Sequence, residues 1–157
     1  MFVTSEGAFL HRVDQHADEV GEILNLKPWT IRNANEFRDV IIYQLLYFGT
    51  EENEHKIMNL LPNETSTRWH PSFIDIIPRD GGKHRGLEAI CEAEGFTTEE
   101  AIAFGDGDND LTMLEAAGIG IAMQNATPPV QAIADYITLS VDDEGVSHAL
   151  RELGIIA

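Results

Sequence analysis

The chain has 157 residues, enough for one ordinary domain or two small ones. Its 10 Lys and Arg against 27 Asp and Glu give a net charge of −17, which argues against nucleic-acid and anionic-membrane partners because both require a basic face. Hydrophobic residues make up 43% of the chain, a normal share for a folded globular protein. The single cysteine, Cys91, allows no internal disulfide and suits a reducing compartment, so we expect a cytoplasmic protein.

The first part of the chain predicts an α+β unit with mostly antiparallel pairing. Short strands are expected around a turn at Gly7, and an amphipathic helix is expected over residues 14–24, where apolar residues recur at helical spacing. The remaining expected elements are a buried strand at 39–48, a helix at 51–61 and strands at 65–69 and 73–77. We place the boundary of this unit near residues 72–82 and define the first domain as residues 1–72.

Residues 73–157 predict an α/β domain with a parallel sheet. Helices are expected at 84–94, 109–117 and 145–153, and short apolar strands at 101–104, 119–122 and 136–138. Short strands that are wholly apolar are typical of a sheet covered on both faces, and their alternation with helices indicates parallel pairing.

The most informative segment is Phe104-Gly105-Asp106-Gly107-Asp108-Asn109-Asp110, which follows an apolar strand and opens a helix. Ligands bind at that edge of open α/β sheets. Three carboxylates within five residues favour a hard cation such as Mg²⁺ or Ca²⁺, or else form a solvated acidic turn that caps the next helix. An EF-hand is excluded because Leu111 and Ala117 stand where Gly and Glu are required. The dinucleotide-binding pattern G-x-G-x-x-G fails as well.

The order and spacing of several segments resemble the haloacid-dehalogenase-like (HAD) phosphatases, specifically their Cof-type sugar-phosphatase branch. The segments are Gly105–Asp110, Met113-Leu114, Ala117–Met123, Asn125-Ala126, Ala134–Thr138 and Asp143–Val146. The resemblance is strong from about Arg68 to Ile156. It implies that residues 73–157 are the second half of a Rossmann-like parallel-sheet core and that residues 1–72 are part of an α+β cap.

The resemblance also implies roles for individual residues. Lys83 matches the lysine that steadies the nucleophile and the transferring phosphoryl group, and Asn109 matches the residue that orients this lysine or the phosphate. Asp106 matches the Mg²⁺ ligand, and Asp110 matches a second acidic position that supports the metal shell, often through water. Asp108 occupies a variable position and is not expected to be a ligand.

One motif of the family is not found in these 157 residues. The DxDGT motif supplies the nucleophilic aspartate of such enzymes, and neither Asp80 nor Asp142-Asp143 is followed by Gly-Thr. The chain therefore resembles the C-terminal half of an enzyme, and we expect it to be inactive alone. Trp69 and His70 are weaker candidates for substrate contacts, since aromatic residues at a domain junction are more often packing.

Three functions remain open at this stage. The first is a Mg²⁺-dependent phosphatase that acts on a small phosphorylated metabolite of the sugar-phosphate class through an aspartyl-phosphate. The second is a non-catalytic pseudo-phosphatase, or a half-protein that acts by self-association or by binding a complementing N-terminal half. The third is a fragment of the phosphorylation domain of a P-type ATPase, whose hinge region carries similar GDGxND and GIAM sequences.

Overall fold

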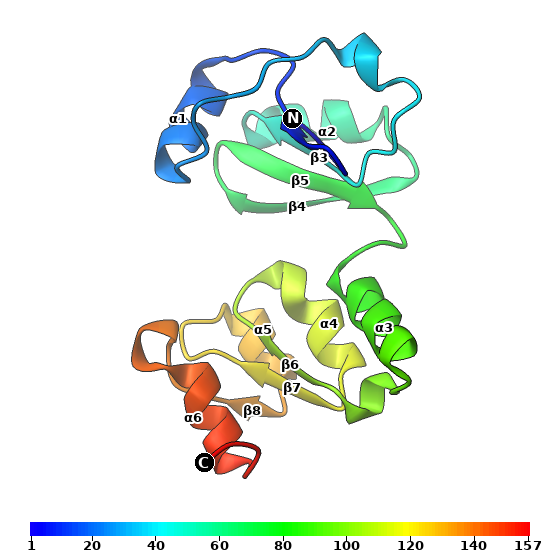
Figure 1. Ribbon diagram of the computed structural model, residues 1–157. Coiled ribbons are helices and arrows are strands. Elements are labelled where there is room, and N and C mark those ends of the chain that lie inside the picture. Colours follow the sequence, from blue (N-terminus) through cyan, green and yellow to red (C-terminus); the bar gives the residue numbers. More distant parts are fainter. The chain divides into compact units, whose positions relative to one another are not determined.

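The computed structural model describes residues 1–157 apart from the side chain of Trp69, and it divides into two compact units, Met1–Asp80 and Gly81–Ala157 (Figure 1). The observed division after Asp80 lies within the boundary region of residues 72–82 expected from the sequence, and later than residue 72, where the first domain was taken to end. The physical reason is that strand β5 (Phe73–Pro78) forms ladders with strands β3 (Gln44–Phe48) and β4 (Glu64–His70), which makes it part of the first sheet.

The first unit contains one antiparallel sheet with the strand order β2-β1-β3-β5-β4. Its other elements are β1 (Phe2–Thr4), β2 (Gly7–Phe9), α1 (Gln15–Ile23), the 3-10 helix η1 (Ala34–Phe37) and α2 (Glu51–Met58). The predicted antiparallel α+β unit is therefore observed. Strand β3 is shorter than predicted, because Val40, Ile41 and Tyr43 precede the paired residues and are exposed to solvent.

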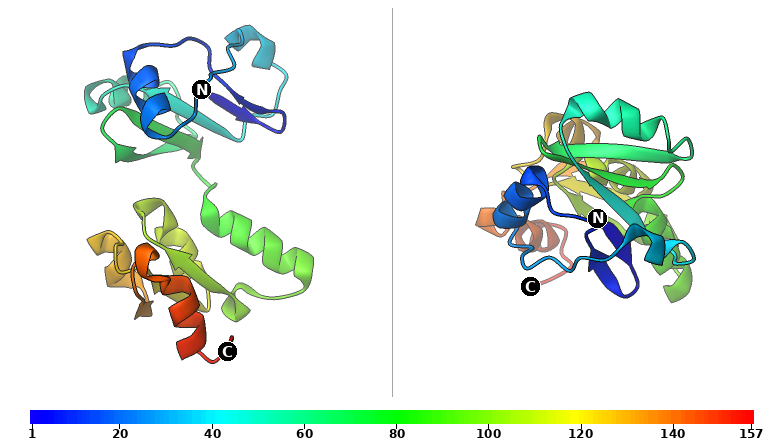
Figure 2. Two further views of the ribbon diagram at one scale, coloured as in Figure 1. Left: turned by 60° about the vertical axis from the view of Figure 1, so that its left-hand side comes forward. Right: turned by 90° about the horizontal axis from the view of Figure 1, so that it is seen from above.

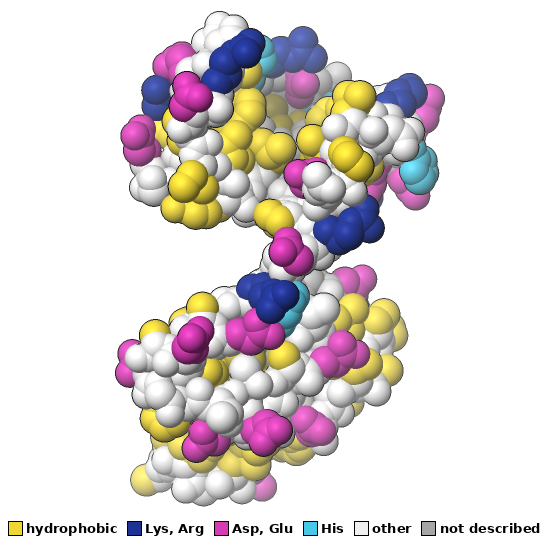
Figure 3. All heavy atoms as spheres, turned by 90° about the vertical axis from the view of Figure 1, so that its right-hand side faces the viewer, with side chains coloured by type: hydrophobic (Ala, Val, Ile, Leu, Met, Phe, Trp, Pro, Cys, Tyr) yellow, Lys and Arg dark blue, Asp and Glu magenta, His cyan; other side chains and the backbone are white. Residues whose placement is uncertain are grey.

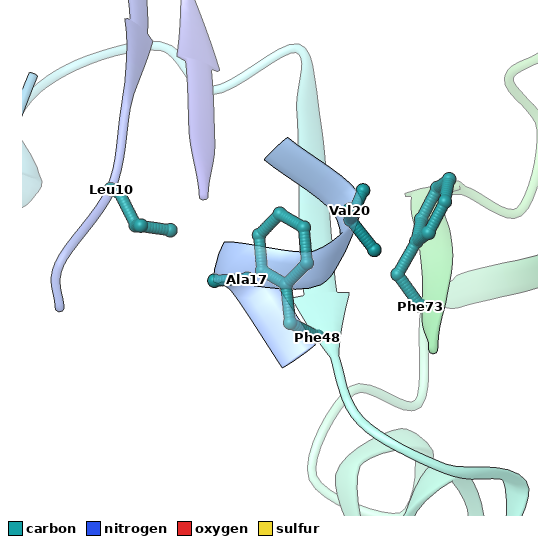
Figure 4. Close-up of a cluster of buried hydrophobic side chains, with 5 residues drawn as sticks. All are labelled: Leu10, Ala17, Val20, Phe48 and Phe73. Carbon is teal, nitrogen blue, oxygen red and sulfur yellow. The ribbon is translucent and has the colours of Figure 1, made fainter. Parts of the chain in front are cut away.

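Helix α1 packs its apolar face against this sheet. Asp14 caps the helix by accepting a hydrogen bond from the Ala17 N–H at 3.0 Å. A hydrophobic core cluster of this unit consists of the buried side chains of Leu10, Ala17, Val20, Phe48 and Phe73 (Figure 4). The apolar residues that recur at helical spacing in α1 are thus buried against β3 and β5.

An ion pair fixes the irregular end of strand β4. The Arg68 Nε donates to Glu54 Oε2 at 2.9 Å, and Arg68 Nη1 donates to backbone carbonyls, including those of Pro71 and Phe73. The register of β4 against β5 shifts between Thr67 and His70. Arg68 therefore supplies the donors for carbonyls at the bulge and the following turn.

The second unit contains a parallel sheet with the strand order β6-β7-β8. Its strands are β6 (Ile102–Gly105), β7 (Ile119–Ala122) and β8 (Tyr136–Ile137). Its helices are α3 (Lys83–Glu94), α4 (Leu111–Ala116), α5 (Pro128–Ile133) and α6 (Gly145–Glu152), with 3-10 turns η2 (Thr98–Glu100), η3 (Asp108–Asp110) and η4 (Val141–Asp143). The predicted parallel α/β arrangement is confirmed.

Helix α4 organises the core of the second unit. It packs against β6 and β7 and lies between α3 and α5 (Figures 1 and 2). Leu114 of α4, Ala122 of β7 and Val130 of α5 are buried in this core. The predicted helix at 109–117 begins as the 3-10 turn η3 and becomes α-helical only from Leu111, so the acidic loop is tightly wound onto the start of α4. Among the described helices, none is both long and apolar enough to cross a membrane.

Candidate functional site

The acidic loop leaves the carboxyl end of β6 and turns back at once into η3. This turn brings Asp110 so close to the strand that a Cβ atom on Gly105 would lie 2.5 Å from the Asp110 Cβ and 2.6 Å from Leu114 Cδ1. A glycine at residue 105 is therefore required by the close approach of the next turn. The loop thereby places its last carboxylate inside the protein.

Asp110 is buried, with 3% of its surface exposed, and accepts hydrogen bonds at both carboxylate oxygens. Its Oδ2 accepts from the N–H of Asp106 at 2.9 Å and of Gly107 at 3.1 Å, and its Oδ1 is paired with the Lys83 Nζ. Burial by itself would raise the pKa of Asp110, but the hydrogen bond from Lys83, the two backbone donors and the positive charge of Lys83 outweigh it and lower the pKa below its usual value of 3.8. Asp110 is therefore held as a carboxylate.

Lys83 is the first residue of α3 and reaches the acidic loop from a position 27 residues earlier in the chain. Its side chain is 48% exposed, so the ammonium group contacts both Asp110 and solvent. Beside it, the His84 ring Nδ1 lies 3.1 Å from the Thr112 hydroxyl, which ties the start of α3 to the start of α4. The ammonium group of Lys83 is thus held by its carboxylate partner and remains accessible to solvent.

A hollow of about 480 Å³ lies in front of these groups. Its polar lining residues are Lys83, Asp106 and Asp110, and its apolar ones are Phe104, Met113, Met123, Val141 and Val146. Acidic side chains are otherwise scattered over the visible face of the second unit, in the lower part of Figure 3. The ammonium group of Lys83 therefore gives the hollow a local positive charge within a strongly acidic protein.

Asp106 differs from Asp110 in its surroundings. It is exposed, and its Oδ2 accepts a hydrogen bond from the Asn125 Nδ2 at 3.1 Å. Among the residues that the structure describes, its Oδ1 accepts no hydrogen bond. Asp106 and Lys83 line the same hollow, and the family resemblance implies the roles of metal ligand and phosphoryl-binding lysine for them.

The two other polar residues of the loop point to different partners. Asp108 accepts a hydrogen bond from the Thr127 hydroxyl at 2.5 Å, which fits its expected place outside the metal shell. Asn109 is exposed, and within the described structure Lys83 is paired with Asp110 and not with Asn109. The role of Asn109 in orienting a phosphate stays a prediction.

The donor set fits a hard divalent cation only in part. The carboxylate oxygens of Asp106 and Asp110 are of the kind that Mg²⁺ prefers, and neither His nor Cys is among the residues that line the hollow with them. However, no group of three or more His, Cys, Asp or Glu side chains gathers to hold a metal anywhere in the described part of the chain. Asp106 and Asp110 can therefore provide part of a Mg²⁺ shell and not all of it.

The candidate substrate-contact residues belong to the first unit. The His70 Nδ1 accepts from the Ser72 N–H at 3.2 Å, and the His70 ring stacks on Phe73 with centroids 5.6 Å apart. The side chain of Trp69 lies outside the described part of the structure. Packing accounts for the described contacts of His70, and substrate binding by Trp69 and His70 stays a prediction.

Comparison with known proteins adds the family. The family model of the haloacid dehalogenase-like hydrolases matches residues 3–150, nearly the whole chain. The chain belongs to this family. The HAD resemblance that rests on the acidic loop is therefore confirmed, and the match extends through the first unit as well.

Individual HAD relatives match over most of this chain. The 5-amino-6-(5-phospho-D-ribitylamino)uracil phosphatase YitU of Bacillus subtilis (strain 168) is 44% identical over 156 residues, which cover 94% of this chain and 57% of YitU. The structure of the phosphatase BT1666 from Bacteroides thetaiotaomicron superposes with a TM-score of 0.86 at 36% identity, covering 99% of this chain and 58% of BT1666. The HAD subclass IIB sugar phosphatase BT4131 superposes with a TM-score of 0.78 at 34% identity, covering 88% and 55% of the two chains. This chain thus spans little more than half the length of these relatives.

Two residues of the candidate site were not given a role from the sequence. Asn125 and Thr127, in the loop after β7, hold Asp106 and Asp108 through their side chains. The only signal was the Asn125-Ala126 pair within the family resemblance, which carried no role. Hydrogen bonds across 19 residues of sequence have no periodicity from which they could be read.

Proposed function

We propose that this chain supplies the metal-binding and phosphoryl-stabilising half of a Mg²⁺-dependent HAD phosphatase. The observation that carries the proposal is the convergence of Lys83, Asp106 and Asp110 on one hollow at the carboxyl end of β6. A fixed cation beside carboxylates suits a reaction in which charge develops on phosphoryl oxygens. The substrate class we propose is a small phosphorylated metabolite of the sugar-phosphate type, in line with the names of YitU and BT4131.

Each residue receives a distinct task in this proposal. Asp106 is the direct Mg²⁺ ligand, because it keeps a carboxylate oxygen without a partner among the described residues. Asp110, whose two oxygens are both engaged, supports the metal shell through water and holds Lys83 toward the hollow. Lys83 binds a phosphoryl oxygen with the hydrogens that Asp110 does not use. A bound Mg²⁺ would neutralise phosphoryl charge and lower the cost of bringing an anionic substrate to an acidic protein.

The nucleophile of the proposed aspartyl-phosphate route would come from a DxDGT motif, which these 157 residues do not contain. Strand β6 has a partner on one side only among the described strands, namely β7. We propose that its other edge receives the strand that bears the nucleophile, either from a complementing N-terminal half or from a longer form of the same chain. For the chain by itself, the alternative is self-association through this edge. We also propose a cytoplasmic location, which suits the single buried thiol of the chain.

The test compares this chain with a chimera in which the part of YitU outside the matched residues is joined upstream of it. We expect no hydrolysis of p-nitrophenyl phosphate by the chain alone, because Lys83 and Asp106 can only stabilise what a nucleophile begins. The chimera should hydrolyse it in the presence of Mg²⁺, and Lys83→Met or Asp106→Ala should reduce the rate at least about a hundredfold. Asp108→Asn is the matched control and should keep most of the activity.

Two results would contradict the proposal. Turnover by the unmodified 157-residue chain that is lost in Asp106→Ala would show that a nucleophile is present within it. A folded, Mg²⁺-dependent chimera that is unaffected by Lys83→Met would remove the phosphoryl-binding role from Lys83. A chimera that folds and binds Mg²⁺ without any turnover would instead favour the non-catalytic alternative.

A further inference from the structure

The loop after β7 clamps the acidic loop after β6. The Met123 N–H donates to the Gly105 carbonyl at 2.9 Å, and the Thr127 N–H donates to the Asp106 carbonyl at 3.0 Å. Two side chains add to this backbone pairing, the Thr127 hydroxyl on Asp108 and the Asn125 amide on Asp106. The bond from Asn125 is the one that reaches the carboxylate expected to meet the metal.

The orientation of the Asn125 amide is fixed by its second partner. The Val141 N–H, which can only donate, lies 3.1 Å from the Asn125 Oδ1. The amide oxygen therefore faces Val141, and the Nδ2 donor must face Asp106 Oδ2, 3.1 Å away. A flipped amide would set a donor against a donor at Val141 and an acceptor against an acceptor at Asp106.

This arrangement makes the two oxygens of the Asp106 carboxylate different. Oδ2 is held by a neutral amide, which leaves the negative charge of the carboxylate in place, whereas an ammonium partner such as Lys83 would cancel it. Oδ1 accepts no hydrogen bond from any residue that the structure describes. Asp106 is exposed, so without Asn125 its side chain would be free to sample other rotamers in solvent.

We propose that Asn125 is a positioning residue for Asp106. It holds Oδ2 and thereby presents Oδ1 to a divalent cation in the hollow lined by Lys83 and Asp106. This inference rests on the proposed function, because it assigns Asn125 to the same metal site. Hydrogen-bond partners of ligating carboxylates typically contribute about tenfold or more to metal affinity, and we expect an effect of that size here.

The experiment is a Mg²⁺ titration of the 157-residue chain, followed through the backbone amide resonances of Gly105 and Gly107. Asn125→Ala should weaken Mg²⁺ binding about tenfold relative to the unmodified chain. Gln124→Ala is the matched control: it also removes an exposed amide side chain, next to Asn125, and should leave the dissociation constant unchanged. Thermal unfolding of both variants separates loss of metal affinity from loss of the fold.

A second measurement needs no substitution. On Mg²⁺ saturation of the unmodified chain, the side-chain amide protons of Asn125 should shift, because their acceptor becomes a metal ligand. Those of Gln124 should not shift. This readout keeps the proposal testable if Asn125→Ala does not fold.

The possible failures are distinguishable. If Gly105 and Gly107 respond to Mg²⁺ neither in the unmodified chain nor in the chimera that supplies the missing half, the metal site of the proposed function is wrong and the role of Asn125 falls with it. If the unmodified chain binds Mg²⁺ and folded Asn125→Ala binds it equally well, the metal site stands and Asn125 is not a positioning residue. Unmoved Asn125 side-chain resonances at Mg²⁺ saturation lead to that second conclusion as well.

Discussion

The buried carboxylate of Asp110 provides the sharpest test of how the acidic loop is held. Three donors converge on it: the Lys83 ammonium and the N–H groups of Asp106 and Gly107. Asp110→Asn keeps the size of the side chain and replaces one acceptor oxygen by a donor. Whichever way the new amide turns, it sets a donor against Lys83 or against the two N–H groups.

The magnitude follows from the exposure of the partners. Breaking a fully buried ion pair costs about 3–5 kcal/mol, because it leaves a charge without a partner. Lys83 is half-exposed, so water replaces part of what it loses, and the cost from this partner falls toward that of a surface pair. Water compensates less for the hydrogen bonds lost by the two backbone N–H groups, since Asp110 itself is buried. We expect Asp110→Asn to lower the free energy of unfolding of the second unit by about 2–3 kcal/mol.

The assay must report on the second unit alone. Both tryptophans, Trp29 and Trp69, belong to the first unit, so fluorescence does not follow the second. Hydrogen exchange of the Ile121 amide in the central strand β7 does, and it should accelerate about 30- to 150-fold, since each 1.4 kcal/mol is a factor of ten. Asp108→Asn is the matched control and should change exchange less than about threefold.

The same contribution should depend on pH in one direction. The pKa of Asp110 in the folded protein is lowered below 3.8, so its stabilising effect is complete above the value of the unfolded chain and is lost as the pH falls through the folded value. The difference in stability between the unmodified chain and Asp110→Asn should therefore be constant near neutrality and shrink below pH 3.8. Exchange at Ile121 that is equally slow in both proteins at neutral pH would refute the reasoning.

Two glycine substitutions test the fold around the site. Gly105→Ala should destabilise the second unit by about 1–3 kcal/mol, because its Cβ would overlap the Asp110 Cβ. Gly86→Ala in α3, where an added Cβ would have nothing within 4 Å, should instead stabilise this unit by up to about 1 kcal/mol. Hydrogen exchange of the β7 amides measures both effects, and a neutral Gly105→Ala would contradict the close approach. Arg68→Met should lower the free energy of unfolding of the first unit by about 3 kcal/mol, because it leaves Glu54 without its cation in a site where both side chains are less than a fifth exposed. Tryptophan fluorescence during denaturation measures this loss. A loss under about 0.5 kcal/mol would show that the pair is only a surface contact.

The regular elements of this fold could be predicted because they rest on local patterns. The apolar residues of α1 recur at helical spacing and bury Ala17 and Val20 as expected. The apolar strands β6 and β7 pair in parallel, as their alternation with helices predicts. The strand at 73–77 was expected as an element of the first unit, whereas the domain limit at residue 72 left it in the second. Its own residues do not specify its partners, and the ladders with β3 and β4 decide its unit.

The residues of the candidate site could be predicted from the sequence, but the hydrogen bonds and ion pair between them could not. Lys83, Asp106 and Asp110 were named through the family resemblance, and the structure brings all three to one hollow. That Lys83 would pair with Asp110 could not be read from the sequence, because hydrogen bonding across 27 residues depends on where α3 lies beside α4. The contacts of Asn125 could not be predicted for the same reason, since its two partners lie in the acidic loop and at the start of η4.

The distribution of hydrogen-bond and ion-pair partners among the three carboxylates of the acidic loop bears on the proposed metal site. A solvated turn would leave its three carboxylates in equivalent surroundings, and their mutual repulsion would be shared among them. Here Asp110 is neutralised by a cation, Asp108 receives a hydroxyl and Asp106 receives only a neutral amide at one oxygen. The negative charge that the loop does not neutralise from within is therefore concentrated on Asp106 and Asp108, and of these only Asp106 lines the hollow with Lys83. Under the proposed function, a divalent cation would relieve most repulsion at that point, beside the ammonium group that could share a phosphoryl anion with it.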